Sequence, residues 1–489
     1  MADNIKTTPL RLRPSEHRTI LLIGDLVMGF ISVFAAIQTW KQYNIFVEAT
    51  LLVEKNKMVF ERAKQIVEEF FVIKVPFWFY LLPIIWIVLL VELYEPHIAG
   101  SGRKTTRGIA IAALLGLIAF SLLFITRQDT NLPRIGVGAF LLYASVLTLT
   151  WRMIFIRMYK QTGEWRRILL VGAGKAGQTL AELYNSLGPR SFHIIGFVDD
   201  DEQKIGEIYH DLPVLGTSNH LLDLIDDNHI SDLVVAINGE IQGSTFQTIL
   251  DAQEKGVDVT RMPILYEEMT GRVPIHHLES DWIIRSFVDG LSISGFYLLF
   301  KRLMDILGGL VGMMIVAAAT PFLALAIFLD SGLPIIYSQP RHGRGRSTFT
   351  IYKFRTMRKK TDNQQDSKTT AVNDPRITRV GKFMRRTRLD ELPQFWNVLR
   401  GDMSLVGPRA EVPKLVDEYE KHIPFYRARL LVKPGLAGWA QINYGYASTI
   451  EETSIKLEYD LYYIKHRTLA MDFQIILRTI GTVFRRTGR

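Results

Sequence analysis

Four long apolar blocks fill the first third of the chain, at residues 19–40, 71–91, 108–126 and 135–156. Each is close to the roughly 20 residues that a helix needs to cross the hydrocarbon core of a bilayer. Buried helices of a soluble bundle would be the alternative, but such helices normally carry a polar stripe. The pattern therefore predicts a domain of four transmembrane helices over residues 1–160.

Basic residues flank these blocks in three places. They are Arg11, Arg13 and Arg18 before the first block, Arg103, Lys104 and Arg107 between the second and third, and Arg157, Lys160, Arg166 and Arg167 after the fourth. The loop after the first block also holds lysines, but together with many glutamates. Because basic flanks stay preferentially in the cytoplasm, both ends of the bundle are expected to face the cytoplasm.

An alternation of strands and helices follows, over residues 161–275. The apolar run 167–171 is followed by Gly172-Ala-Gly174-Lys-Ala-Gly177, a helical run and a second strand that ends at Asp199. This order is the context of a dinucleotide fingerprint, in which the glycines admit a phosphate to a helix N-terminus and the acid holds a ribose. We expect a cytoplasmic Rossmann-like domain with a parallel sheet. The motif indicates a fold more than an activity, so the domain could also bind nothing or bind a nucleotide for regulation.

A fifth apolar block covers residues 303–329 and is interrupted by Thr320-Pro321. Proline removes a backbone donor and clashes with the preceding turn, so a bend is expected there. The long basic stretch after this block, residues 341–409, favours a re-entrant helix that returns to the cytoplasmic side. A proline-kinked helix that crosses the membrane is the alternative.

Apolar residues recur at helical spacing near the C-terminus, among them Leu469, Phe473 and Ile476, with several arginines beside them. This helix could lie at a membrane interface, or it could pack on its own domain.

Composition narrows the class of protein. Hydrophobic residues make up 48% of the 489 residues, the net charge is +9, and there is no cysteine. The absence of cysteine excludes disulfides, thiolate metal sites and cysteine nucleophiles. A basic excess suits nucleic acid, anionic lipid or a phosphorylated substrate, and by itself does not choose among them.

The chemically informative segment carries two adjacent acids, Asp390 and Glu391, followed by Leu392-Pro393 and an apolar helical run. Since proline is favoured in a first helical turn, the acids are expected at a helix start. Eight cations lie near them in the sequence: Lys353, Arg355, Arg376, Arg379, Arg385, Arg386, Arg388 and Arg409. This group of cations suits an anionic substrate such as a pyrophosphate. Reactions of pyrophosphates commonly need Mg²⁺, and a carboxylate can act as the nucleophile in them. Spacing alone favours a simpler interpretation, a helix cap with surface ion pairs.

The segment from Asp374 to Arg409, with Arg-Leu-Asp390-Glu391-Leu-Pro at its centre and Gly-Pro-Arg409 at its end, closely resembles the bacterial sugar transferase family. Its members are monotopic phosphoglycosyl transferases, also called polyprenyl-phosphate glycosyl-1-phosphate transferases. The runs 352–357, 433–443 and 459–465 match further family segments. The catalytic resemblance begins at Phe296, within an expected mainly helical catalytic domain over residues 276–489. Large members also have the bundle and the Rossmann-like module.

The resemblance implies a role for each matched residue. Asp390 would attack the β-phosphate of a UDP-sugar, releasing UMP, and a lipid phosphate would then take the sugar phosphate from the enzyme. Glu391 would orient Asp390, and both acids would hold Mg²⁺, the one cofactor expected. Thr320 and Pro321 match the break of the family's re-entrant helix. The resemblance makes Arg409, Lys353 and Arg355 phosphate contacts. Closeness to the acid pair in the sequence adds four arginines to the expected phosphate-binding set: Arg376, Arg379, Arg386 and Arg388.

The implied reaction moves a hexose-1-phosphate from a donor such as UDP-glucose or UDP-galactose to undecaprenyl phosphate. It would be the first membrane step of exopolysaccharide, capsule or O-antigen synthesis. The expected location is the bacterial inner membrane, with the catalytic domain on the cytoplasmic face and a homodimer as in large members. No nucleic-acid partner is expected.

Two departures from the family pattern bear on the donor and on one loop. Arg409 is followed by Ala410 where the family often has proline, which predicts a less rigid loop. The run Asn443-Tyr444-Gly445-Tyr446 replaces a common Asn-Gly-Arg, so a cation expected near the nucleotide is missing.

Two rival hypotheses remain. A membrane-bound NAD-dependent nucleotide-sugar dehydratase or epimerase would use the glycine motif and a Tyr-x-x-x-Lys pair, a spacing that Tyr297 and Lys301 have. A scaffold without activity would only lay its basic domain on anionic lipid.

Overall fold

The computed structural model describes residues 14–94, 101–126, 133–162, 166–186, 192–278, 295–358, 374–445, 447 and 449–484. Arg11, Arg13 and Tyr446 lie outside this described part. Two compact units make up the chain. One holds residues 1–170, 181–233 and 247–259, and the other holds 171–180, 234–246 and 260–489. The domain boundaries proposed from the sequence, after residues 160 and 275, stay predictions.

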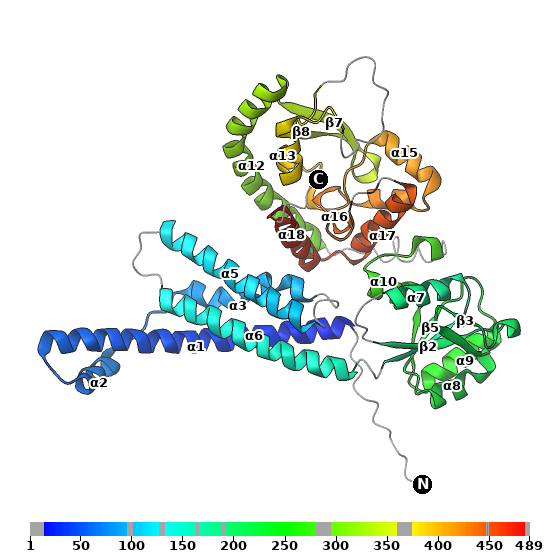
Figure 1. Ribbon diagram of the computed structural model, residues 1–489, viewed down its shortest axis with the longest axis horizontal. Helices are drawn as coiled ribbons and strands as arrows, with labels where there is room; N and C mark the ends of the chain where they lie inside the picture. The colour runs from blue at the N-terminus through cyan, green and yellow to red at the C-terminus, as the bar shows by residue number, and fades with distance from the viewer. Residues whose placement is uncertain are drawn as a thin grey trace, which may run out of the picture. The chain divides into compact units, whose positions relative to one another are not determined.

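Apolar helices build the N-terminal bundle. In chain order they are α1 (Pro14–Asn56), α2 (Phe60–Phe70), η1 (Phe77–Leu81), α3 (Leu82–Leu89), η2 (Val91–Tyr94), α5 (Gly102–Thr126) and α6 (Arg134–Thr162). Figure 1 shows α1 and α6 side by side along most of α6, with α5 on the same bundle. Their contacts bury a core that includes Val33, Trp86 and Phe140.

Four helices in the described part are long and apolar enough to cross a membrane: Thr19–Asn56, Gly102–Ser121, Arg134–Met158 and Gly295–Ser331. They correspond to the first, third, fourth and fifth apolar blocks. Large apolar side chains on them are exposed, among them Phe34, Leu142 and Phe322. Helices of this length and hydropathy with outward apolar side chains are typical of chains that face lipid, so the protein is a membrane protein.

The second block, residues 71–91, was predicted as one spanning helix and does not form one. Its apolar helical stretch is only Phe77–Leu89, split between η1 and α3. Pro76 is extended and precedes η1, and Pro83 lies at the start of α3. Residues 71–76 are not helical, because Pro76 lacks a donor and disfavours helix in the residue before it. Pro83 lies in the first turn of α3, where proline is tolerated, so the helical stretch begins only after Pro76.

A buried ion pair crosses the bundle. Arg152 Nη2 of α6 donates to Asp25 Oδ2 of α1 at 2.6 Å, and both side chains are at most 1% exposed. Tyr94 donates to the same carboxylate at 2.8 Å, and Arg152 Nη1 donates to the Leu93 carbonyl at 2.8 Å. Charged groups among apolar helices are stable only when paired in this way, so the pair fixes how α1, η2 and α6 meet.

Asp25→Asn or Arg152→Met alone should destabilise the bundle by about 3–5 kcal/mol, because the remaining charge is left buried without its partner. Replacing both residues with apolar ones should recover most of this loss. Thermal unfolding in detergent would measure the effects. The control is Glu68→Gln, which breaks the exposed Lys64–Glu68 pair at 3.9 Å and should cost under about 1 kcal/mol. Equal effects at the two pairs would contradict the account.

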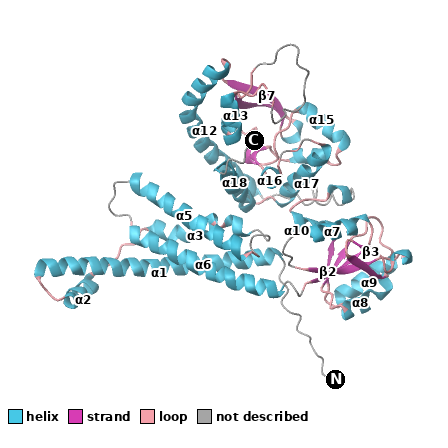
Figure 2. Ribbon diagram, viewed as in Figure 1, coloured by secondary structure: helices cyan, strands magenta, loops and turns pink. Residues whose placement is uncertain are grey.

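A six-stranded sheet lies in the next part of the chain. Its strands are β1 (Arg167–Val171), β2 (His193–Val198), β3 (Ile208–Tyr209), β4 (Leu212–Gly216), β5 (Asp232–Val235) and β6 (Asp258–Arg261), in the order β3-β4-β2-β1-β5-β6. β2 pairs with β4 in parallel, and β3 pairs with β4 antiparallel. Figure 2 shows helices on both sides of the sheet. They are α7 (Lys175–Ser186), α8 (Leu221–Asp227) and α9 (Gly243–Glu254), and α10 (Met262–Thr270) follows β6 in the chain. The predicted parallel-sheet region is confirmed, and its identification as Rossmann-like stays a prediction.

The C-terminal part is mainly helical, as predicted. Its helices are η5 (Ile275–His277), α12 (Gly295–Ser331), η7 (Arg344–Arg346), α13 (Arg379–Thr387), η8 (Leu389–Gln394), α14 (Phe395–Arg400), α15 (Pro413–His422), η9 (Tyr426–Leu431), α16 (Trp439–Asn443), α17 (Ile450–His466) and α18 (Leu469–Phe484). Two small sheets pair β7 (Ile336–His342) with β8 (Thr348–Phe354), antiparallel, and β9 (Ser404–Val406) with β10 (Gly435–Ala437), parallel. The core includes Met471 and Ile475 of α18, so this helix packs on its own domain, as one of the two alternatives proposed.

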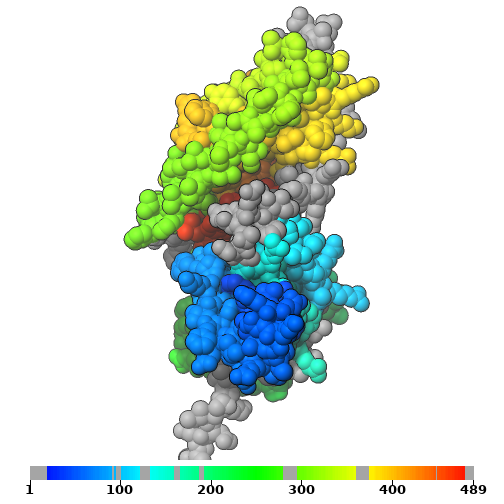
Figure 3. Space-filling view, turned by 90° about the vertical axis from the view of Figure 1, so that its left-hand side faces the viewer, coloured from blue at the N-terminus to red at the C-terminus, as the bar shows by residue number. Residues whose placement is uncertain are grey.

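α12 is one helix through Pro321, and Thr320 Oγ1 donates to the Val316 carbonyl at 2.6 Å. Figure 1 shows the helix changing direction along its length, and Figure 3 shows it on the outside of the C-terminal part. Its inner face is held close to α14, since a Cβ at Gly312 would overlap the ring of Phe395. The helix thereby anchors the segment that follows η8. That α12 re-enters rather than crosses the membrane stays a prediction.

α17 is joined to α10 and the segment after it by charged contacts. Glu458 accepts from Tyr266 at 3.1 Å and lies 3.5 Å from Arg272. Glu267 accepts from Lys465 at 2.8 Å and contacts His466 at 2.7 Å. Burial raises the pKa of Glu458 to about 7, and Arg272 and Tyr266 offset only part of this.

Because the pKa of Glu458 is raised, its contribution to stability is full below the unfolded value of 4.5 and is lost as pH rises through about 7. Glu458→Gln should remove this loss. Its melting temperature relative to the native chain should therefore increase from about pH 5 to about pH 8. Thermal melts across that range would test this, with Glu254→Gln on the exposed side of α9 as control. A constant difference at every pH would refute the assignment.

Candidate active site

The acid pair lies in the first turn of η8, the helix start that the sequence predicts. The element before it, α13, is capped by Thr378, whose Oγ1 accepts from the Gly381 amide at 2.9 Å. Arg388 then adopts a left-handed conformation with φ of 56°, which ends α13 and turns the chain into η8. This turn directs the two acids toward the sheet of β7 and β8.

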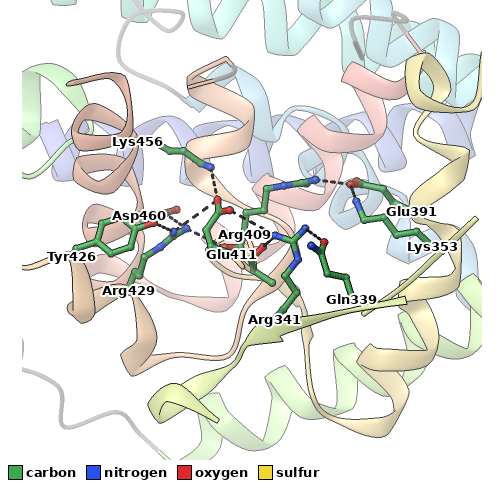
Figure 4. Close-up of polar contacts among 11 residues, drawn as sticks. Gln339, Arg341, Lys353, Glu391, Arg409, Glu411, Tyr426, Arg429, Lys456 and Asp460 are labelled. Carbon is green, nitrogen blue, oxygen red and sulfur yellow. Dashed lines mark hydrogen bonds and ion pairs between the residues drawn. The ribbon is translucent and has the colours of Figure 1, made fainter. Parts of the chain in front are cut away.

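Glu391 is held by two cations from distant segments. Lys353 Nζ of β8 donates to Glu391 Oε1 at 2.8 Å, and Arg409 Nη2 donates to the same oxygen at 2.7 Å. Figure 4 shows both side chains reaching this carboxylate. Burial works against its ionisation, but the charges of Arg409 and Lys353 outweigh burial and hold the pKa of Glu391 well below its usual value.

Asp390 has the opposite environment. Its residue is 9% exposed, and no described residue donates a hydrogen bond to its carboxylate. Burial, and then the charge of Glu391, raise the pKa of Asp390 to about 6, although Lys353, Arg385 and Arg409 act against this. The pKa values of the two neighbouring carboxyls are thus shifted in opposite directions. Such a difference is typical of catalytic acid pairs.

The other cations predicted for phosphate binding are placed differently. Arg355 donates to the carbonyls of Met357 and Leu333 at 2.9 and 2.8 Å. Arg376 forms a two-point contact with Asp374 at 2.6 and 2.9 Å. Arg379 begins α13, Arg386 lies in its last turn, and Arg388 follows it. Of the predicted set, the structure joins Lys353 and Arg409 to the acid pair by hydrogen bonds.

Arg385 was noted among the neighbouring cations but not proposed as a site residue. Its charge acts on Asp390, and its Nε donates to Thr356 Oγ1 at 3.0 Å. Gly381, one turn earlier on α13, lies against the Thr356 carbonyl. Helical spacing from the buried Gly381 could have identified Arg385 as the inward-facing arginine.

A second charged cluster lies directly behind Arg409, and sequence reasoning missed it. Its centre is Glu411, which accepts from Lys456 at 3.1 Å and lies 3.8 Å from Arg341 and 3.9 Å from Arg429. Arg429 also donates to Asp460 at 2.9 Å and to Tyr426 at 2.5 Å. These residues come from β7, η9 and α17, so no local spacing could reveal them. A small pocket here is lined in part by His342, Pro408, Arg409, Glu411 and Arg429.

The glycine-rich segment runs from the end of β1 into α7. Gly172 has φ of +111°, and a Cβ there would lie 3.0 Å from the Ala236 carbonyl oxygen. Gly174 is open, and Gly177 lies in α7. Asp199, the acid proposed for a ribose, accepts from Lys204 at 3.1 Å. A nucleotide at this loop stays a prediction.

Tyr297 and Lys301, the pair proposed for a dehydratase, serve packing between helices. Both donate to Asp472 of α18, at 3.0 and 2.9 Å. These bonds tie α12 to α18 and do not favour the dehydratase hypothesis.

Comparisons with known proteins identify the family of the chain. The model of the family described as bacterial sugar transferase matches residues 296–486. A UDP-galactose-lipid carrier transferase of Erwinia amylovora is 31% identical over 356 residues, which cover 68% of this chain and 71% of that protein. The chain belongs to the bacterial sugar transferase family. A model described as CoA-binding domain matches residues 90–263.

Other relatives match a smaller share of their own length. A UDP-N-acetylgalactosamine-undecaprenyl-phosphate N-acetylgalactosaminephosphotransferase of Aeromonas hydrophila is 41% identical over 46% of this chain and 52% of its own. A UDP-glucose:undecaprenyl-phosphate glucose-1-phosphate transferase of Xanthomonas campestris is 32% identical over 56% of this chain and 57% of its own. The chain therefore spans little more than half the length of these relatives. A solved UDP-D-quinovosamine 4-dehydrogenase from Vibrio fischeri aligns with 19% of this chain and 76% of its own, at 29% identity and a TM-score of 0.17, too low to support a shared fold.

Proposed function

We propose that this protein transfers a hexose-1-phosphate from a UDP-sugar to undecaprenyl phosphate, giving a lipid-diphosphate sugar and UMP. The observation that carries the proposal is the acid pair: a buried Asp390 without a hydrogen-bond partner among the described residues, beside a Glu391 clamped by Lys353 and Arg409. The family and the names of the relatives support it. The protein would act in the inner membrane with its catalytic domain on the cytoplasmic face.

The reaction would proceed in two displacements at one phosphorus. An Asp390 carboxylate oxygen attacks the β-phosphorus of the UDP-sugar, and the bond to the bridging oxygen breaks so that UMP leaves with the electron pair. The product is an acyl phosphate that joins Asp390 to the sugar. An oxygen of undecaprenyl phosphate then attacks the same phosphorus, and Asp390 leaves as a carboxylate. Lys353 and Arg409 hold Glu391 in place, and their positive charge favours the dianionic diphosphate.

The acid pair fits Mg²⁺. Both cations bind Glu391 Oε1, so Oε2 and the Asp390 carboxylate have no hydrogen-bond partner among the described residues. Mg²⁺ is usually held by one or two carboxylates plus substrate phosphates, and the described residues hold no cluster of three or more acids or histidines that would form a complete protein cage. Bound there, the ion would neutralise charge on the diphosphate.

The names of the relatives point to different sugars, namely N-acetylgalactosamine, glucose and galactose. We infer a UDP-hexose donor and leave its identity to assay. A re-entrant α12 and a homodimer belong to the same proposal, by analogy with large family members.

The departure from the family pattern at Tyr444 and Gly445 lies just after α16, and Arg478 of α18 donates to the neighbouring Asn443 at 3.2 Å. This arginine is a cation close to the place where the family pattern has one.

Asp390→Asn should lower UMP release by about a thousandfold or more, because the amide is not a nucleophile. The assay uses a panel of UDP-sugars with Mg²⁺ and polyprenyl phosphate in detergent. Asp417→Asn, whose side chain is 57% exposed on α15, is the matched control and should keep normal turnover. Undiminished release by Asp390→Asn, with folded protein, would exclude the role of Asp390. If no UDP-sugar in the panel yields UMP, the proposed reaction is wrong.

The covalent step makes a separate prediction. Without any lipid phosphate, the native protein should release up to one UMP per chain in a rapid burst and then stop. Mass spectrometry should find a hexose phosphate on the peptide that contains Asp390. Direct transfer to the lipid would instead give no UMP until the acceptor is added.

A further inference from the structure

Behind Arg409, the carboxylate of Glu411 is surrounded by cations from three separate elements. Lys456 Nζ of α17 donates to Oε1 at 3.1 Å, and Arg429 Nη1 of η9 lies 3.9 Å from the same oxygen. Arg341 Nη1 of β7 lies 3.8 Å from Oε2. The Glu411 side chain is 16% exposed, so these charges face one another with little water between them. Figure 4 shows this convergence.

The same cations also hold the main chain that carries Arg409. Arg429 Nη2 donates to the Arg409 carbonyl at 3.0 Å, and Arg341 Nη1 donates to the Ala410 carbonyl at 3.2 Å. The His342 amide donates to the Glu411 carbonyl at 3.1 Å. Three successive carbonyls are thus fixed by donors outside the loop. Alanine at position 410 leaves φ free, so these bonds rather than a proline ring set the direction of the loop.

We propose that Glu411 is a positioning residue: as the shared counter-ion of Arg341, Arg429 and Lys456, it fixes the loop from which Arg409 reaches Glu391 and the donor diphosphate. The inference rests on the proposed function. Glu411 touches neither substrate nor the acid pair in this account, and it acts through Arg409 alone.

The electrostatics support the assignment. Burial alone would raise the pKa of Glu411, but the charges of Lys456, Arg429, Arg409 and Arg341 bring it down to about 2. Glu411 is therefore ionised at neutral pH. Without its charge, these cations would repel one another, and Asp460 would remain as the counter-ion of Arg429. Arg429 keeps its bonds to Asp460 and Tyr426, so the fold is expected to survive while the loop moves.

The test is a double-mutant cycle on UMP release in the native, full-length protein. Glu411→Gln keeps the shape of the side chain and removes its charge. It should lower kcat/KM by about 10–100-fold, the size expected when a catalytic group is displaced by roughly 1 Å. In an Arg409→Ala background, the same substitution should cause less than a twofold further loss, because there is no guanidinium left to position. Glu411→Asp keeps the charge and should retain more activity than Glu411→Gln.

Each outcome bears on one claim. Independent, multiplicative losses in the cycle, or a Glu411→Gln protein as active as the native one, would overturn the positioning role while Asp390→Asn remains inactive. If Asp390→Asn keeps its activity, the proposed mechanism fails instead. Should Glu411→Gln not fold, Glu411→Asp in the same cycle still decides, since a loss that persists without Arg409 contradicts the proposal. Asp417→Asn, an exposed carboxylate on the neighbouring α15, should leave kcat/KM unchanged.

Discussion

The carboxylate of Glu391 accepts from Lys353 and Arg409, and this three-residue contact joins β8, η8 and the loop after β9. Joined, they create a site in which the pKa of Glu391 is lowered well below its usual value and the pKa of Asp390 is raised to about 6. Burial, and then the negative charge of Glu391, raise the pKa of Asp390, which forms no ion pair with a described residue. The geometry of the site depends on this contact more than on any local motif.

The surrounding elements serve to bring these segments together. Close packing of α12 against α14 fixes the end of η8, and the β7–β8 pair carries Lys353 to the acids. On the far side, α17 contributes Lys456 and Asp460 to the cluster behind Arg409 and also binds Glu267 through Lys465. One helix therefore contacts both the loop of Arg409 and the segment that leads into the C-terminal part.

Local features were predictable from the sequence, and contacts between distant segments were not. The strand at 167–171 and the helix start at Asp390 follow from runs of neighbouring residues and were placed correctly. The block 71–91 was misjudged because summed hydropathy ignores that Pro76 keeps the first residues of the block out of the helix. Arg355 and Arg376 were grouped with the phosphate-binding cations on proximity in sequence, although each donates to a partner of its own. The ion pairs of Glu411 could not be predicted from local sequence, since its partners lie up to 70 residues away along the chain.

The number of cations near an acid is a poor guide to its role, and pairing is a better one. Asp374 lies in the same basic stretch as Asp390, yet its pKa is held at about 2 by Arg376 two residues on, so it is a satisfied ion pair. Glu411 has several cations and supports a loop. Asp390 has three cations nearby but a bond to none of them, and burial works against its charge. A carboxylate in this position gains most when a cationic or electrophilic group arrives, which is the condition that a diphosphate with its metal ion would supply.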